Sequence, residues 1–159
     1  MVLVILLWTG CLYLSVTHAA TTANLVVNGD AENGTTGWTV SSGLPQSISA
    51  PDNLGFAAAQ GIFYFAGQGF GAGVSPGTTL DTMRQTIDVS GMAADIALGT
   101  VTFDLTAQQT TWTGSDVPVL ELEAFDATDV SLGVWNLTNN TSQTWTPVAT
   151  TGNVPATTD

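Results

Sequence analysis

Apolar and polar residues alternate in short runs along most of the chain, and clusters of Gly, Asn, Asp, Ser and Thr separate the runs. The clearest run is 100–108, where Val101, Phe103, Leu105 and Ala107 alternate with polar residues. Successive residues of a strand point to opposite faces of a sheet, so this pattern predicts a strand with one buried face. Similar runs predict further strands at 24–27, 38–41, 62–66, 83–89, 119–125, 130–137 and 144–149. Only the segment 92–98 has a helical pattern.

Many short strands between turn signals favour a β-sandwich or jelly roll over any helical architecture. The turn residues at 126–129 predict a hairpin between the two runs that flank them. A chain of 159 residues is enough for one such domain. The final segment 152–159 (GNVPATTD) forms no recognisable strand, so we expect a sandwich that lacks its last strand. Truncation of the sequence would explain this, and a strand supplied by another chain is the alternative.

The first 19 residues form an apolar segment without a charged side chain. It is short for a membrane span and ends in small residues, which predicts a secretory signal peptide cleaved after Ala19. A retained N-terminal anchor is the alternative. The only cysteine, Cys11, and the only histidine, His18, would leave with the segment. We therefore expect a secreted or cell-surface domain at 20–159 that has neither a disulfide nor an imidazole.

The chain carries 13 acidic residues and a single basic one, Arg84, for a formal net charge of −12. This balance disfavours nucleic acid and anionic membranes as partners, because both would be repelled. Without histidine in the mature domain, a Ser-His-Asp triad is excluded. The function classes that remain are binding, assembly and carboxylate-based hydrolysis.

Three segments together resemble the galactose-binding-domain-like jelly rolls, a superfamily that includes many carbohydrate-binding modules. The segment 24–32 (NLVVNGDAE), followed by Gly37-Trp38, resembles their opening motif. The segment 85–90 (QTIDVS) is similar to one of their strand endings, and 120–133 resembles their central hairpin. The resemblance implies a jelly-roll sandwich with a carbohydrate-binding function.

The resemblance also implies a structural calcium ion, because the glutamate of the opening motif helps to hold one in many relatives. Glu32 occupies that position, and Asp30 lies two residues before it. Carboxylate oxygens are the ligands that Ca²⁺ prefers, and such an ion would join loops without taking part in chemistry. The alternative is that Asp30 caps a turn and Glu32 is solvated.

Sugar binding needs flat aromatic faces together with a few polar side chains. Trp112 lies in a polar segment between two predicted strands, which makes it the first candidate for ligand contact. Tyr64, Arg84 and Gln109 are further candidates at strand ends and loops, although Arg84 could instead pair with an aspartate. Trp38 follows a glycine in the opening motif and is expected in the core.

Two other functions stay open. A structural or adhesive surface protein would use the same sandwich to associate with its own copies. A jelly-roll glycoside hydrolase would use Glu121 and Glu123, whose Cα atoms lie roughly 6.5–7 Å apart along one face of a strand. The alternation places Leu120, Leu122 and Ala124 inside, so the two glutamates are expected on the solvent face.

Glycosylation is expected if the source organism modifies Asn-X-Ser/Thr triplets. The candidate acceptors are Asn33, Asn136, Asn139 and Asn140.

Overall fold

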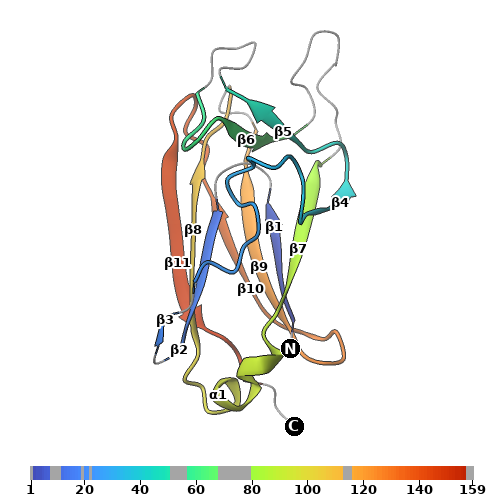
Figure 1. Ribbon diagram of the computed structural model, residues 1–159, viewed down its shortest axis with the longest axis vertical. Helices are drawn as coiled ribbons and strands as arrows, with labels where there is room; N and C mark the ends of the chain where they lie inside the picture. Colours follow the sequence, from blue (N-terminus) through green and yellow to red (C-terminus); the bar gives the residue numbers. More distant parts are fainter. Residues whose placement is uncertain are drawn as a thin grey trace.

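The computed structural model is an all-β sandwich of antiparallel sheets, as the sequence predicts (Figure 1). It describes residues 2–7, 12–18, 20, 21, 23–50, 57–67, 80–112 and 116–156, with the backbone alone for those up to 21. The larger sheet contains, in spatial order, β10 (Ser131–Thr138), β9 (Val119–Phe125), β1 (Val2–Leu7), β7 (Thr82–Asp88) and β4 (Thr39–Ser42). The smaller sheet contains β11 (Thr146–Asn153), β8 (Thr102–Gln109), β2 (Leu12–His18) and β3 (Ala20–Thr21). A separate pair, β5 (Gln46–Ser49) and β6 (Phe63–Ala66), lies across one end of the sandwich.

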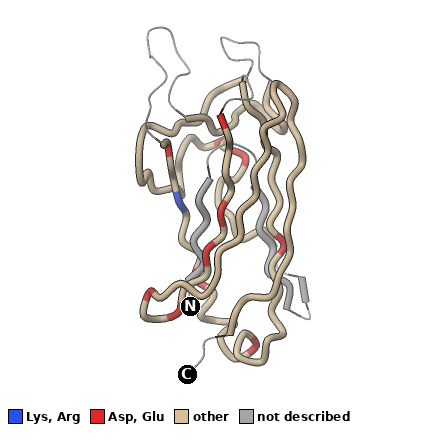
Figure 2. The backbone as a smooth tube through the Cα atoms, turned by 180° about the vertical axis from the view of Figure 1, so that it is seen from behind, with Lys and Arg blue, Asp and Glu red and all other residues tan. Residues whose placement is uncertain are grey.

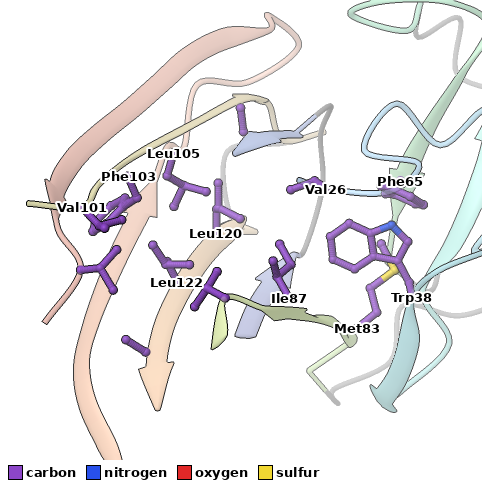
Figure 3. Close-up of a cluster of buried hydrophobic side chains, with 14 of the residues drawn as sticks. Val26, Trp38, Phe65, Met83, Ile87, Val101, Phe103, Leu105, Leu120 and Leu122 are labelled. Atoms are coloured by element: carbon purple, nitrogen blue, oxygen red, sulfur yellow. The ribbon is translucent and has the colours of Figure 1, made fainter. Parts of the chain in front are cut away.

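The core fills the space between the two sheets (Figure 3). Leu120 and Leu122 of β9 and Phe103 and Leu105 of β8 have no exposed surface. The Phe103 ring meets the Trp135 ring of β10 edge to face, with 4.8 Å between centroids. Each such side chain contributes roughly 1.5–3 kcal/mol by leaving water, so this apolar layer holds the sheets together.

Burial in the central strands follows the alternation in the sequence. In β8 and β9 every second residue is buried and the residues between them are half-exposed. β9 and β10 form the predicted hairpin, in which the Asp126 amide donates to the Val130 carbonyl at 3.0 Å. The predicted helical segment is also present, as a 3₁₀ turn (Ser90–Met92) followed by α1 (Ala93–Ala97).

The strand predicted at 24–27 is wrong, because these residues adopt no strand conformation. The Val27 backbone bonds the side-chain amide of Gln85 instead of a neighbouring strand. β5 is a strand that the sequence did not reveal, since its residues show no alternation of apolar and polar types. β11 begins at Thr146 and continues to Asn153, four residues beyond the predicted end.

The N-terminal segment forms two strands within the sandwich. β1 lies between β7 and β9 and runs antiparallel to both. β2 pairs with β8 over Leu12 to Thr17 and is followed by the short β3. Cleavage after Ala19 would remove both β1 and β2, and it stays a prediction.

The acidic residues are dispersed over strands and loops, and Arg84 lies on β7 (Figure 2). Within the described part of the chain, no helix has the length and apolar character needed to cross a bilayer.

Candidate ligand site at the aromatic end

Two aromatic side chains meet at the end of the sandwich where β6 crosses it. Tyr64 of β6 and Trp145 pack edge to face, with 5.6 Å between ring centroids and 74° between planes. The Trp145 indole N–H donates to the Ala57 carbonyl at 2.7 Å. Trp145 is half-buried and Tyr64 is 5% exposed, so Trp145 presents the larger accessible surface.

Trp112 lies in the neighbouring loop, which is tied to the segment just before Trp145. The Thr111 amide donates to the Thr141 carbonyl at 3.2 Å, and the Gln143 amide donates back to the Thr111 carbonyl at 2.8 Å. The Ser142 hydroxyl donates to the Trp112 carbonyl at 2.9 Å. The half-buried Trp112 therefore stands on a backbone fixed to the loop that carries Trp145. We call Tyr64, Trp112 and Trp145 the aromatic end.

Gln109 is close to the aromatic end but lies in the interior. Its side chain has no exposed surface, and its Nε2 donates to the Leu137 carbonyl of the facing sheet at 3.3 Å. Its Oε1 is buried and has no hydrogen-bond partner among the described residues. The backbone of Gln109 is also bonded, because Asn139 Nδ2 donates to the Gln109 carbonyl at 3.1 Å. Through these two hydrogen bonds, Gln109 connects β8 to β10 and to the loop 139–143.

Arg84 lies apart from the other predicted ligand residues. It is exposed on the outer face of the larger sheet, opposite Thr39 of β4. The structure therefore brings Trp112, Tyr64 and Gln109 to one end of the sandwich and leaves Arg84 on a face. Trp145 is the residue that sequence reasoning missed, because its strand-like surroundings did not distinguish a core position from the outer face of a strand.

The predicted calcium ligands belong to the loop 28–38, which is held by side chains. Glu32 Oε1 accepts the amides of Ile62 at 2.7 Å and Phe63 at 2.8 Å, and so ties this loop to the start of β6. Asp30 Oδ1 accepts the Glu32 amide at 3.4 Å. Within the part of the chain that the structure describes, no group of three or more His, Cys, Asp or Glu gathers in a metal-binding arrangement. The calcium site stays a prediction.

Gln85 is a structural residue whose role the sequence did not reveal. Its Oε1 accepts the Val27 amide at 2.8 Å, and its Nε2 donates to the carbonyls of Val27 and Gly37, both at 3.0 Å. The side chain is 6% exposed. The sequence does contain one indication of this role, because Gln85 is a polar residue at one of the alternate positions of β7 that are buried. We call these three bonds the glutamine clasp.

Asn28 and Trp38 complete the same loop. Asn28 has a left-handed backbone, with φ of 51°, which asparagine adopts more readily than most residues. Its Nδ2 donates to the carbonyls of Gly34 and Thr36 at 2.9 and 3.1 Å. The Trp38 indole N–H donates to the Asn28 carbonyl at 3.3 Å. Trp38 itself is buried in the core, as expected.

The carboxylates of the larger sheet lie on its outer face. Glu121 and Glu123 are half-exposed and alternate with the buried residues Leu120, Leu122 and Ala124 of β9, which confirms the expected alternation. At the hairpin turn, amide donation from Val130 and hydrogen bonds from Thr128 hold the pKa of Asp126 below its usual value. The Ser90 amide and hydroxyl lower the pKa of Asp88 in the same way.

Comparison of the chain with protein-family models, with curated proteins and with solved structures finds no match.

Proposed function

We propose that this protein is an exported carbohydrate-binding module of the jelly-roll type, and that it binds sugar at the aromatic end. The observation that carries the proposal is the convergence of Tyr64, Trp112 and Trp145 from three separate segments onto one end of the sandwich. Aromatic faces stack on the C–H surfaces of sugar rings, and polar groups beside them bond the hydroxyls. The loop 139–143 (NNTSQ) places polar side chains next to both tryptophans, and two of them, Ser142 and Gln143, bond the Trp112 carbonyl.

The charge of the chain narrows the class of sugar. With a net charge of −12, the protein repels uronic acids, sulfated glycans and sialylated glycans. Arg84, the single cation, lies on the outer face of the larger sheet and away from the aromatic end. The proposed ligand is therefore a neutral glycan.

The proposal includes a structural calcium ion at Glu32 and Asp30. Glu32 already joins the loop 28–38 to β6 through two amides. A cation would strengthen the same connection, with the remaining carboxylate oxygens as its ligands.

The test is binding of the secreted protein to an array of neutral and acidic glycans, with calcium and with a chelator. We expect binding to neutral glycans, and a roughly tenfold loss of affinity in Trp112→Ala and in Trp145→Ala, because one aromatic contact contributes up to about 1.5 kcal/mol. Val134→Ala is the control, since Val134 is exposed on the outer face of β10, away from the aromatic end. A folded protein that binds no glycan, or that binds equally well without both tryptophans, would refute the proposal.

A self-associating surface protein is the second candidate, and the edge strand β4 favours it. All four residues of β4 are exposed, and β4 is the outermost strand of the larger sheet. Val40 is 47% exposed there, and Leu44 just after the strand is 63% exposed. An exposed apolar edge is a template for pairing with another copy. Light scattering that shows oligomers, abolished by Val40→Lys, would support this function.

A further inference from the structure

The loop 28–38 contains both Asn-Gly pairs of the chain, Asn28-Gly29 and Asn33-Gly34. An asparagine before glycine can lose its side-chain amide spontaneously, because glycine has no side chain to hinder attack by its own amide nitrogen on the asparagine Cγ. The two pairs have the same chemistry but lie in different surroundings. We propose that Asn33 is a site of spontaneous deamidation in the folded protein and that the fold protects Asn28.

The side-chain amide of Asn28 is bonded through both of its polar atoms. Its Nδ2 donates to the carbonyls of Gly34 and Thr36 at 2.9 and 3.1 Å. Its Oδ1 accepts the Asn33 amide at 2.9 Å. Asn28 is half-buried, and Gly29, which would supply the attacking nitrogen, is buried. These bonds hold the Asn28 Cγ in place and must break before it can turn toward the Gly29 nitrogen.

The side-chain amide of Asn33 has no such restraint. Its backbone is bonded, since the Asn33 amide donates to Asn28 Oδ1 and the Asn33 carbonyl accepts the Thr36 amide. Among the described residues, its side chain makes no hydrogen bond. Asn33 and Gly34 are both exposed, and a Cβ added to Gly34 would meet no atom within 4 Å beyond its chain neighbours. The Asn33 Cγ is therefore free to approach the Gly34 nitrogen.

The reaction needs only water. The Gly34 nitrogen gives up its proton and forms a bond to the Asn33 Cγ, the bond from Cγ to Nδ2 breaks, and ammonia leaves with the proton. Water then opens the resulting five-membered imide. Opening at Cγ gives aspartate, and opening at the former backbone carbonyl gives isoaspartate, in which the chain continues through Cγ. One water is consumed, one ammonia is released, and nothing is oxidised or reduced.

Either product changes the loop. The formal net charge goes from −12 to −13, since one neutral amide becomes one carboxylate. The new carboxylate directly follows Glu32 and lies three residues after Asp30. In isoaspartate, the carbonyl that accepts the Thr36 amide at 3.2 Å becomes that carboxylate, so the turn 33–36 is altered as well. The loop therefore becomes more acidic as the protein ages. This reaction requires neither sugar binding nor export.

The experiment follows both asparagines in the same sample. The full chain is kept in mildly alkaline buffer, once folded and once denatured in guanidinium chloride, and portions are digested over time with a protease that cuts before aspartate. Asp30 lies between the two asparagines, so they fall in separate peptides for mass spectrometry. The aspartate product adds a cleavage site and isoaspartate does not, which resolves the two products. A digest made at the start subtracts any change caused by the digestion.

We expect Asn33 to react in the folded chain at close to its rate in the denatured chain. We expect Asn28 to react about tenfold more slowly in the folded chain than in the denatured one, because its hydrogen bonds must break first. The denatured chain is the reference for each site, so the different residues that follow the two glycines do not affect the comparison.

Asn33→Gln gives a second measurement, made by isoelectric focusing. The longer glutamine side chain does not close the five-membered ring, so the more acidic form should no longer accumulate. The substitution should leave the fold intact, because Asn33 is exposed and its side chain makes no hydrogen bond among the described residues. Asn136→Gln is the matched control, since Asn136 is also exposed but precedes a leucine, and the acidic form should accumulate in it as in the native chain.

Three results would overturn the proposal. The first is an Asn28 that reacts as fast as Asn33 in the folded chain. The second is an Asn33 that the fold slows as strongly as Asn28. The third is an acidic form that accumulates unchanged in Asn33→Gln. Glycan binding is measured separately, and neither a positive nor a negative result there changes these outcomes.

Discussion

The loop 24–38 and the aromatic end are both irregular regions at the margins of the sheets, yet they are built differently. In the loop, the side chains of Gln85, Glu32 and Asn28 are spent on backbone groups. At the aromatic end, backbone groups bond one another across the two loops, the side chains of Asn139 and Ser142 add bonds to backbone carbonyls, and the rings of Trp112 and Trp145 remain partly accessible. The hydrogen bonds of the loop 24–38 fix its backbone conformation, whereas the aromatic end leaves two tryptophan rings partly accessible to a ligand.

This difference separates the residues that resemble a family motif from the residues proposed to bind a ligand. The motif residues of 24–38 hold a loop that has no strand to pair with, so their replacement should affect stability. The aromatic side chains contribute less to the fold, so their replacement should affect affinity. Mutations in the two regions that lower stability and affinity to the same extent would contradict this distinction.

The largest expected effect is in the glutamine clasp. Gln85→Leu removes three part-buried hydrogen bonds to backbone groups of Val27 and Gly37. We expect the free energy of unfolding to fall by about 2–4 kcal/mol. Urea unfolding followed by tryptophan fluorescence measures it. Gln108→Leu, on the half-exposed face of β8, is the control and should change stability by less than about 0.5 kcal/mol. A loss below about 1 kcal/mol in Gln85→Leu would show that the clasp does not hold the loop.

The second effect concerns Glu32 and calcium. Glu32→Gln keeps an acceptor for the amides of Ile62 and Phe63 but loses the charge, so we expect a loss of about 1 kcal/mol without calcium. With calcium at ten times its Kd, the native protein should gain about 1.4 kcal/mol and the variant much less. Thermal unfolding with and without the ion measures both. Glu123→Gln is the control, and an equal calcium response in Glu32→Gln would place any bound ion elsewhere.

The strands could be predicted from the sequence where one face of the strand is buried in the core and the other face is exposed to water. β8 and β9 alternate because one face meets the core and the other meets water, and this leaves a period of two in the sequence. The hairpin turn at 126–129 was predictable because its residues favour tight turns. β5 was not, since its four residues carry no such period and are positioned by pairing with β6.

The N-terminal strands show a deeper limit of sequence reasoning. A uniformly apolar segment suits a signal peptide and a central strand equally well, because both remove it from water. The register of β2 places Leu12, Leu14 and Val16 opposite buried residues of β8, which is the alternation of a strand. The same alternation is present in the sequence of this segment, and the leader interpretation stays a prediction.

The candidate site was predicted in part. Trp112 stood out because a tryptophan in a polar loop has no core to enter. Trp145 and the interior position of Gln109 depend on how distant segments meet, and one sequence does not record that. Gln85 is a polar residue at a buried position of β7, and its role became evident only from its three hydrogen bonds.

The smallest expected effect extends the comparison to the carboxylate of Asp126 at the hairpin turn. Asp126 accepts the Val130 and Thr128 amides and the Thr128 hydroxyl, as Glu32 accepts amides in its loop. These bonds lower the pKa of Asp126 from its usual value in the folded state. A lowered folded pKa means that the stabilisation is fully present above about pH 4 and is lost as the pH falls through the folded pKa. The stability difference between the native protein and Asp126→Ala should therefore be constant from pH 8 to pH 5 and shrink below pH 4. Urea unfolding over this pH series measures it, with Thr128→Val as the partial variant. A difference that persists unchanged in acid would mean that the turn is held by its backbone conformation and not by the charge of Asp126.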